Sequence, residues 1–340
     1  MIRYPNALVQ GQTIGLTAPS SGVNPQLHNL VHESQKQFEK RGYNIEVGET
    51  VWTQHKAASA TKVKRAKELN AMLQNSEIHA IIPPWGGEIL QEILPLIEWE
   101  KAQPKWILGY SDTSTLLFAL TMKTGIATAH GTNLVDLRSD EWDPTTSKFL
   151  DVLSAEGGAT IHQTSSVNYQ SEWSHDRQPK PYVFNLDTET KWESVYTQPV
   201  EMKGRLLGGC MDTIRHLIGT PYGDVKTFQA TYLMNEPIVW FLENCEMSAT
   251  DFHRTLLQMQ QAGWFEHASG IVFGRTEAGQ EVGGFSTFDA LERLAETTNL
   301  PIIYNADIGH VPPQMTFVNG AYATIKVSGG KGEMTMKLKK

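Results

Sequence analysis

The chain has 340 residues, of which 40% are hydrophobic and 19% charged, and its formal net charge is -8 at neutral pH. This composition is typical of a globular protein, and the negative charge argues against a nucleic-acid partner, because such partners require positive charge. No apolar run reaches membrane-spanning length, and the N-terminus lacks the pattern of a signal peptide. Two cysteines make neither a disulfide framework nor a zinc motif. We therefore expect a soluble cytoplasmic protein without a membrane partner.

The first part of the chain alternates between apolar runs and helical patterns. Apolar runs predict strands at 13–18, 44–47 and 80–82, and helically spaced apolar residues predict helices at 27–41 and 61–74. Such alternation indicates an α/β fold built from right-handed β-α-β units, with a parallel sheet covered on both faces. Ligands of these sheets bind beyond the carboxyl ends of the strands.

Three loops follow strand ends and should face one crevice: residues 19–22, residues 83–88 and the turn after Leu108. The last of these carries Ser111, which passes directly into a helical pattern. A serine on a sharp strand-to-helix turn is exposed beside helix N-terminal amides, which suits a nucleophile whose product is an oxyanion. The G-x-S-x-G pattern is half present, because Thr113 replaces its second glycine. By itself the pattern favours a helix N-cap.

After residue 153 the composition changes. Residues 156–199 are polar and contain scattered tryptophans, which indicates a linker with loop or hairpin content. We expect a nucleophile domain at 1–160, a connecting region at 161–200 and a second domain at 201–340. In the second domain we expect strands at 238–242, 270–273 and 301–304, helices at 248–263 and 287–298, and a closing hairpin at 322–327 and 334–338.

A serine nucleophile needs a base and an acid that orients the base. Of 11 histidines, His310 lies on a glycine- and proline-flanked loop just after an expected strand, where it could face a cleft. His130 is its strongest rival. Glu243 ends an apolar strand, so its carboxylate would be partly desolvated and could hold an imidazole. Capping of the following helix is the alternative role, and the better one for Glu246.

Glycines near the first crevice could bring backbone amides close to a ligand. The amides of Gly86 and Gly87 are oxyanion-hole candidates beside that of Asp112, although a plain turn explains these glycines equally well. The sequence contains no zinc-protease motif, no dinucleotide fingerprint and no phosphate loop. These absences favour chemistry without a cofactor or metal.

Several segments together resemble the LD-carboxypeptidase family of serine peptidases, in particular its microcin C immunity (MccF-like) branch. The resemblance runs in order from about residue 14 to residue 314. It rests on the segments Trp85-Gly86-Gly87, Gly109-Tyr110-Ser111-Asp112, Gly204-Arg205-Leu206-Leu207-Gly208-Gly209-Cys210, Gly219-Thr220-Pro221-Tyr222, Leu242-Glu243 and Gly309-His310.

This resemblance implies a Ser111–Glu243–His310 triad with an oxyanion hole from Asp112 and the Gly86-Gly87 pair. It further implies a Rossmann- or flavodoxin-like N-terminal domain, a C-terminal domain of swivelling β/α or half-barrel character, and a homodimer. The expected reaction is cleavage of a peptidyl or aminoacyl-nucleotide amide.

Departures from the murein-recycling branch bear on the substrate. That branch typically has arginine and asparagine where this chain has Trp85 and Cys210, so LD-specific muropeptide cleavage is the alternative function. In the immunity branch an aromatic residue on the connecting loop can stack on a nucleotide base. Trp192 is the first candidate here and Trp173 the next, although either could simply pin a loop. The sequence does not identify the cation that would bind a substrate carboxylate, and Arg205 and Lys203 are two candidates for it. A catalytically silent peptide-binding protein is a third hypothesis.

Overall fold

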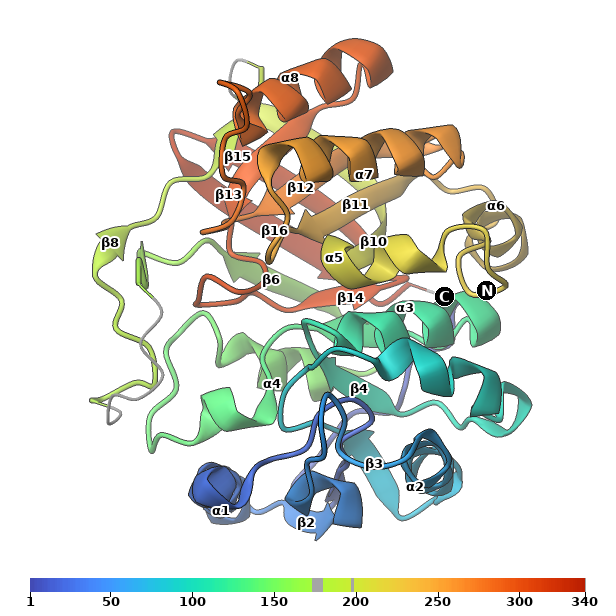
Figure 1. Ribbon diagram of the computed structural model, residues 1–340. Coiled ribbons are helices and arrows are strands. Elements are labelled where there is room, and N and C mark those ends of the chain that lie inside the picture. Colours follow the sequence, from blue (N-terminus) through green and yellow to red (C-terminus); the bar gives the residue numbers. More distant parts are fainter. Residues whose placement is uncertain (173–179, 197–198, 340) are drawn as a thin grey trace.

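The computed structural model describes residues 1–172, 180–196 and 199–339, which form two sheets with helices between and outside them (Figure 1). The first sheet has the strand order β14-β5-β4-β3-β1-β2, and only β14 is antiparallel to its neighbour. Its parallel part follows the flavodoxin-like order 2-1-3-4-5. The strands are β1 Thr13–Leu16, β2 Asn44–Val47, β3 Ile78–Ile81, β4 Trp106–Gly109, β5 Thr128–His130 and β14 Phe317–Asn319.

The second sheet has the order β6-β16-β15-β10-β11-β12-β13-β9. Its centre, β10 to β13, is parallel, and antiparallel strands extend it on both sides. The expected α/β architecture, with a parallel sheet in the N-terminal half and a second β/α domain after it, is thus confirmed. The strands are β6 Thr160–Thr164, β9 Glu193–Ser194, β10 Val200–Cys210, β11 Ile238–Glu243, β12 Ala268–Gly274, β13 Ile302–Ala306, β15 Tyr322–Ser328 and β16 Lys331–Lys337.

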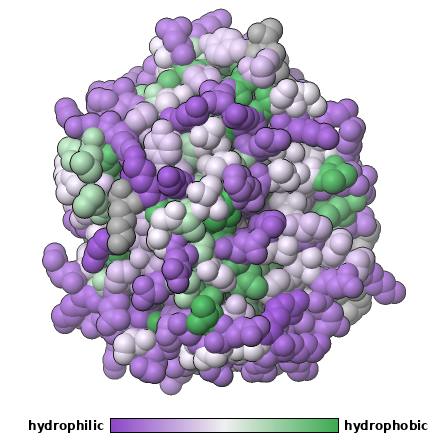
Figure 2. Space-filling view, turned by 180° about the vertical axis from the view of Figure 1, so that it is seen from behind, coloured by the Kyte–Doolittle hydropathy of each residue, from purple (hydrophilic) through white to green (hydrophobic). Residues whose placement is uncertain are grey.

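Helices cover both sheets. Those of the first half are α1 His28–Lys40, α2 Lys62–Gln74, α3 Thr113–Thr124 and α4 Lys148–Leu153. Those of the second half are α5 Met211–Ile214, α6 Val225–Phe228, α7 Ala249–Gln261 and α8 Thr287–Thr298. No helix in the described ranges is long and apolar enough to cross a membrane. On the face seen in Figure 2, hydrophilic side chains predominate and strongly hydrophobic ones lie in small separate groups, as on a water-facing surface.

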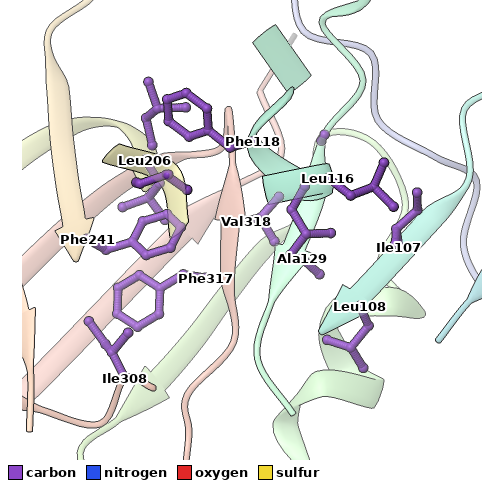
Figure 3. Close-up of a cluster of buried hydrophobic side chains, with 14 of the residues drawn as sticks. Ile107, Leu108, Leu116, Phe118, Ala129, Leu206, Phe241, Ile308, Phe317 and Val318 are labelled. Atoms are coloured by element: carbon purple, nitrogen blue, oxygen red, sulfur yellow. The ribbon is translucent and has the colours of Figure 1, made fainter. Parts of the chain in front are cut away.

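Helix α3 lies between the two sheets (Figure 1), and all of its residues except Lys123 are buried. A helix that is apolar all round must be covered on every side. In Figure 3, Leu116 of α3 lies near Ile107 and Ala129 of the first sheet, and Phe118 lies beside Leu206 of the second. One continuous core therefore fixes the start of α3 relative to both sheets.

The region 161–200, expected as a linker, contributes more than connections. It supplies most of β6 and all of β9, and it contains a two-stranded ribbon of β7 (Asn168–Tyr169) and β8 (Thr188–Glu189). In β6, Ile161 and Gln163 alternate inward, and the Gln163 amide both donates to and accepts from the backbone of Thr316. A polar residue thus takes a core position because its hydrogen bonds are satisfied.

Candidate active site

Ser111 lies on the turn between β4, which ends at Gly109, and α3, which begins at Thr113. Its φ of 62° is in the left-handed region, which residues other than glycine rarely adopt. Backbone strain of this kind is concentrated at functional sites. The turn is therefore a strained elbow that holds the serine hydroxyl outside the regular structure, and not merely the cap of α3.

The side chain of His310 connects Ser111 to Glu243. Its Nε2 lies 3.0 Å from Ser111 Oγ, and its Nδ1 lies 2.8 Å from Glu243 Oε2. Glu243 is the fully buried last residue of β11. Gly309 (φ +87°) approaches this carboxylate so closely that a Cβ there would overlap it. Three distant segments therefore form one hydrogen-bonded chain, in which the carboxylate fixes the proton on Nδ1 and leaves Nε2 free to accept.

The electrostatic interaction between Glu243 and His310 favours the charged form of each group, and therefore an ion pair. Burial alone would raise the pKa of Glu243, but the imidazole of His310 holds it below its ordinary value. Burial alone would lower the pKa of His310, but the Glu243 carboxylate and Cys245 raise it well above 6.5. An imidazolium formed by proton transfer from Ser111 would thus be stabilised where it arises.

Gly86 lies directly against the serine turn. A Cβ on Gly86 would be 2.6 Å from Ser111 Cβ and 2.8 Å from both Ser111 Oγ and the amide nitrogen of Asp112. The Asp112 carboxyl group accepts hydrogen bonds from the Ser20 hydroxyl and the Leu90 amide, and burial raises its pKa. It therefore holds together the loops around Ser111.

Two cavities meet at Ser111. One, of about 350 Å³, is lined by residues of all three loops that follow strand ends, among them Gly22, Trp85 and Tyr110, and by His310. The three loops thus face one cavity, as expected. The other, of about 400 Å³, is lined by Ser111 and by polar residues that follow β10 and β11. The Trp85 indole donates to the carbonyl of Gly22 at 3.1 Å, which holds its ring at the first cavity.

His130 does not take part in the chain of hydrogen bonds. It is buried, and neither ring nitrogen has a partner in the part of the chain that the structure describes. Burial lowers its pKa to about 4, so it stays neutral in the core. Of the two histidines considered from the sequence, only His310 reaches Ser111.

The proposed stacking role of Trp192 is wrong. Its side chain is 0% exposed, and its indole nitrogen donates to Asp307 Oδ2 at 2.8 Å, so no ring face is available to a ligand. The alternative, an indole that pins the connecting region to the second sheet, is the one observed. Trp173 lies outside the described residues.

The expected carboxylate-binding role of Arg205 is also wrong. Its guanidinium is buried, pairs with Glu236 and donates to the carbonyls of Gly320 and Lys339. Lys203 pairs with Glu201 on the surface. Both residues precede Cys210 by five positions or more on β10, so they lie toward the opposite end of the strand from the cavity.

Cys210, which the sequence suggested as a substrate-binding residue, lines the larger cavity with Ser111. Asp212, Arg215 and Cys245 line the same cavity, and the sequence patterns did not point to them. Asp212 accepts from the backbone amides of Cys245 and Glu246, which joins the two strand-end loops. The available signal was position, because a residue just beyond a parallel strand's carboxyl end lies at the same edge as Glu243.

A strained serine elbow, a histidine and a buried carboxylate at the edges of parallel sheets define a serine-type hydrolase. Comparison with known families agrees: the LD-carboxypeptidase N-terminal domain matches residues 14–131, and the LD-carboxypeptidase C-terminal domain matches residues 203–325. The chain belongs to this family of serine-type carboxypeptidases.

Relatives match along nearly the whole chain. A Vibrio cholerae protein named as a carboxypeptidase is 27% identical over 95% of this chain and 94% of its own length. The microcin C7 self-immunity protein MccF of Escherichia coli is 23% identical over 94% of this chain and 91% of its own length. A Bacillus subtilis protein named as a murein peptide carboxypeptidase is 24% identical over 95% and 92%.

Solved structures share the fold. An MccF-like protein from Bacillus anthracis superimposes with a TM-score of 0.83 at 24% identity, over 98% of this chain and 99% of that one. MccF in complex with aspartyl sulfamoyl adenosine has a TM-score of 0.82 at 21% identity, over 99% of this chain and 100% of that one. A muramoyltetrapeptide carboxypeptidase from Oxalobacter formigenes has a TM-score of 0.73 at 18% identity, over 96% of this chain and 98% of that one.

Proposed function

We propose that the chain hydrolyses an amide bond with Ser111 as nucleophile, His310 as general base and then acid, and Glu243 as the group that orients His310. The observation that carries this proposal is the continuous chain of hydrogen bonds, 2.8 Å from Glu243 to His310 and 3.0 Å from His310 to Ser111. These distances lie within the reach required for proton transfer. No cofactor enters the reaction.

In this mechanism His310 Nε2 takes the proton of Ser111 while Oγ attacks a carbonyl carbon next to a free carboxylate or an acyl-phosphoramidate. The tetrahedral oxyanion accepts hydrogen bonds from the amides of Asp112 and of the Gly86-Gly87 pair. His310 then protonates the leaving amine, and the acyl-enzyme forms. Water activated by the same imidazole hydrolyses the acyl-enzyme and frees the serine.

The first test is labelling and turnover of Ser111→Ala, with the exposed Ser76→Ala as its matched control. We expect Ser111→Ala to fold but to lose both hydrolysis and reaction with a serine-directed fluorophosphonate. Ser76→Ala should retain both. An active, labelled Ser111→Ala protein would refute the assignment.

For the substrate we propose a peptidyl or aminoacyl-nucleotide amide. The Trp85 ring borders the cavity beside Ser111 and offers an aromatic surface for a nucleobase. MccF, which shares the fold, has been solved with aspartyl sulfamoyl adenosine. A stacked base contributes about 1–3 kcal/mol, so Trp85→Ala should raise KM for such a substrate roughly 5- to 150-fold. Preferred cleavage of a murein tetrapeptide, unaffected by Trp85→Ala, would instead support the murein alternative.

For the cation that holds a substrate carboxylate we propose Arg215. It lines the larger cavity, and its Nη1 donates to Met247 Sδ at 3.1 Å and to Thr255 Oγ1 at 3.2 Å, neither of which is a carboxylate. Its buried Nε has no partner in the residues that the structure describes. Arg215→Gln should raise KM for a substrate with a free carboxylate at least tenfold, but not for its C-terminal amide. The exposed Arg254→Gln is the control. Equal effects on both substrates would exclude this role.

The proposal also covers the location of the protein and its assembly. We expect a cytoplasmic homodimer, as the resemblance to the immunity branch implies. Light scattering coupled to size-exclusion chromatography tests the assembly, and a monomer at micromolar concentration would contradict it.

A further inference from the structure

Three potential metal ligands lie close together near Ser111. One ligand atom each from Cys210, Glu243 and His310 lie within 4.8 Å of one another. They come from the end of β10, the end of β11 and the loop after β13, so the sequence gives no metal motif. Ligand atoms at roughly 2.0–2.3 Å from zinc lie about 3.5 Å apart, so small side-chain rotations would bring these three into range.

The Glu243 carboxylate provides an independent sign of an incomplete site. Its Oε2 is taken by His310, but Oε1 is buried and has no hydrogen-bond partner in the described ranges. An orphaned buried carboxylate oxygen is costly unless a proton donor or a cation reaches it. The Cys210 thiol is a neighbouring group, because its Sγ and a carboxylate oxygen of Glu243 lie within 4.8 Å of each other.

We propose that Cys210, Glu243 and His310 form an inhibitory site for a thiophilic divalent cation such as Zn²⁺. Thiolate, imidazole and carboxylate are the ligand types that zinc takes, and three protein ligands leave a position for water. The cation replaces the thiol proton, which passes to solvent, so binding strengthens as pH rises. Asp212, whose Oδ2 lies 3.7 Å from Cys210 Sγ, stands beside the site and attracts the cation. Entry is through the cavity that Cys210 and Ser111 share.

The bound cation would stop the reaction whichever imidazole nitrogen it takes. On Nε2 it occupies the lone pair that must accept the serine proton. On Nδ1 it displaces the proton onto Nε2, which then donates to Ser111 and cannot accept. This inhibition rests on the proposed function, whereas the binding itself does not.

The test uses Co²⁺ as a spectroscopic probe on metal-free full-length Ser111→Ala protein, because Ser111 is not a ligand. We expect one Co²⁺ per chain, a sulfur-to-cobalt charge-transfer band in the near ultraviolet, and displacement of that band by Zn²⁺. Cys210→Ser should abolish the band and weaken binding at least about a hundredfold, more than loss of an outer partner would. Cys210→Ala is a second variant in case the serine protein is unstable.

The matched control is Cys245→Ser, whose sulfur lies outside the group of three although it lines the same cavity. It should keep the band. Absence of a band in the Ser111→Ala protein, or a band that survives Cys210→Ser and disappears in Cys245→Ser, overturns the proposal. In the native protein, Zn²⁺ should inhibit hydrolysis and a chelator should restore it. Ser111-independent hydrolysis together with a normal cobalt band would reject the proposed mechanism and leave the metal site standing.

Discussion

Substitution of Gly86 by alanine should separate catalysis from folding. The φ of Gly86 is not in the left-handed region, so alanine fits its backbone, but the new Cβ would lie 2.6 Å from Ser111 Cβ. Real Cβ contacts essentially never come below 3.0 Å, so the serine turn must retreat by about 0.4 Å or more. The same Cβ crowds the Asp112 amide. A donor lost from an oxyanion hole costs about 2.7–4 kcal/mol, so we expect kcat to fall roughly 10²- to 10³-fold.

The assay is steady-state hydrolysis of an aminoacyl-nucleotide amide, accompanied by thermal unfolding. Gly158→Ala is the control, because nothing lies within 4 Å of its Cβ position and its left-handed backbone makes the substitution a test of strain alone. It should lose stability and keep kcat. A Gly86→Ala enzyme with native kcat would show that neither this glycine nor the turn beside it approaches the reacting atoms.

Three further outcomes follow from the contacts. Glu243 raises the pKa of His310, and the base must be deprotonated to work, so the acid limb of the kcat/KM profile should have its midpoint above pH 6.5. In Glu243→Gln this midpoint should fall, and kcat should drop roughly 10⁴-fold. An unchanged midpoint would contradict the interaction between Glu243 and His310. Trp192→Phe removes a buried donor to Asp307 and should lower the free energy of unfolding by about 1–3 kcal/mol without changing KM; a changed KM would restore the indole to the binding site. Arg205→Ala should likewise destabilise the fold, measured by urea unfolding, and leave carboxylate specificity intact.

Local patterns predicted the elements that position the nucleophile. The expected strand at 44–47 coincides with β2, and the helix expected at 61–74 differs from α2 by one residue. The serine turn, the carboxylate that ends β11 and the loop after β13 were each recognisable as strand ends. Parallel packing then brings such ends to one edge, so a rule about topology selected the same three side chains as the resemblance did.

The positions of the candidate substrate-binding residues could not be predicted in this way. Arg205 and Cys210 belong to one motif, but a strand advances about 3.3 Å per residue, so their α-carbons lie roughly 16 Å apart and serve different ends of β10. The tryptophan at 192 lies in a polar segment, and only the buried Asp307 carboxylate explains why its ring turns inward. The partner of Trp192 is 115 residues away. The Arg205 guanidinium is held by Glu236, 31 residues away, and by carbonyls 115 and 134 residues away. No local pattern reveals such partners.

The position of strand β14 affects the order in which the two halves of this enzyme can fold during synthesis. It belongs to the last tenth of the polypeptide, yet it closes the edge of the first sheet against β5. During synthesis the serine turn is made early, but the edge strand of its sheet is made just over two hundred residues later. The loop bearing His310 immediately precedes that edge strand. A nascent chain that has not reached this loop therefore lacks both the edge strand and His310, the base proposed for Ser111.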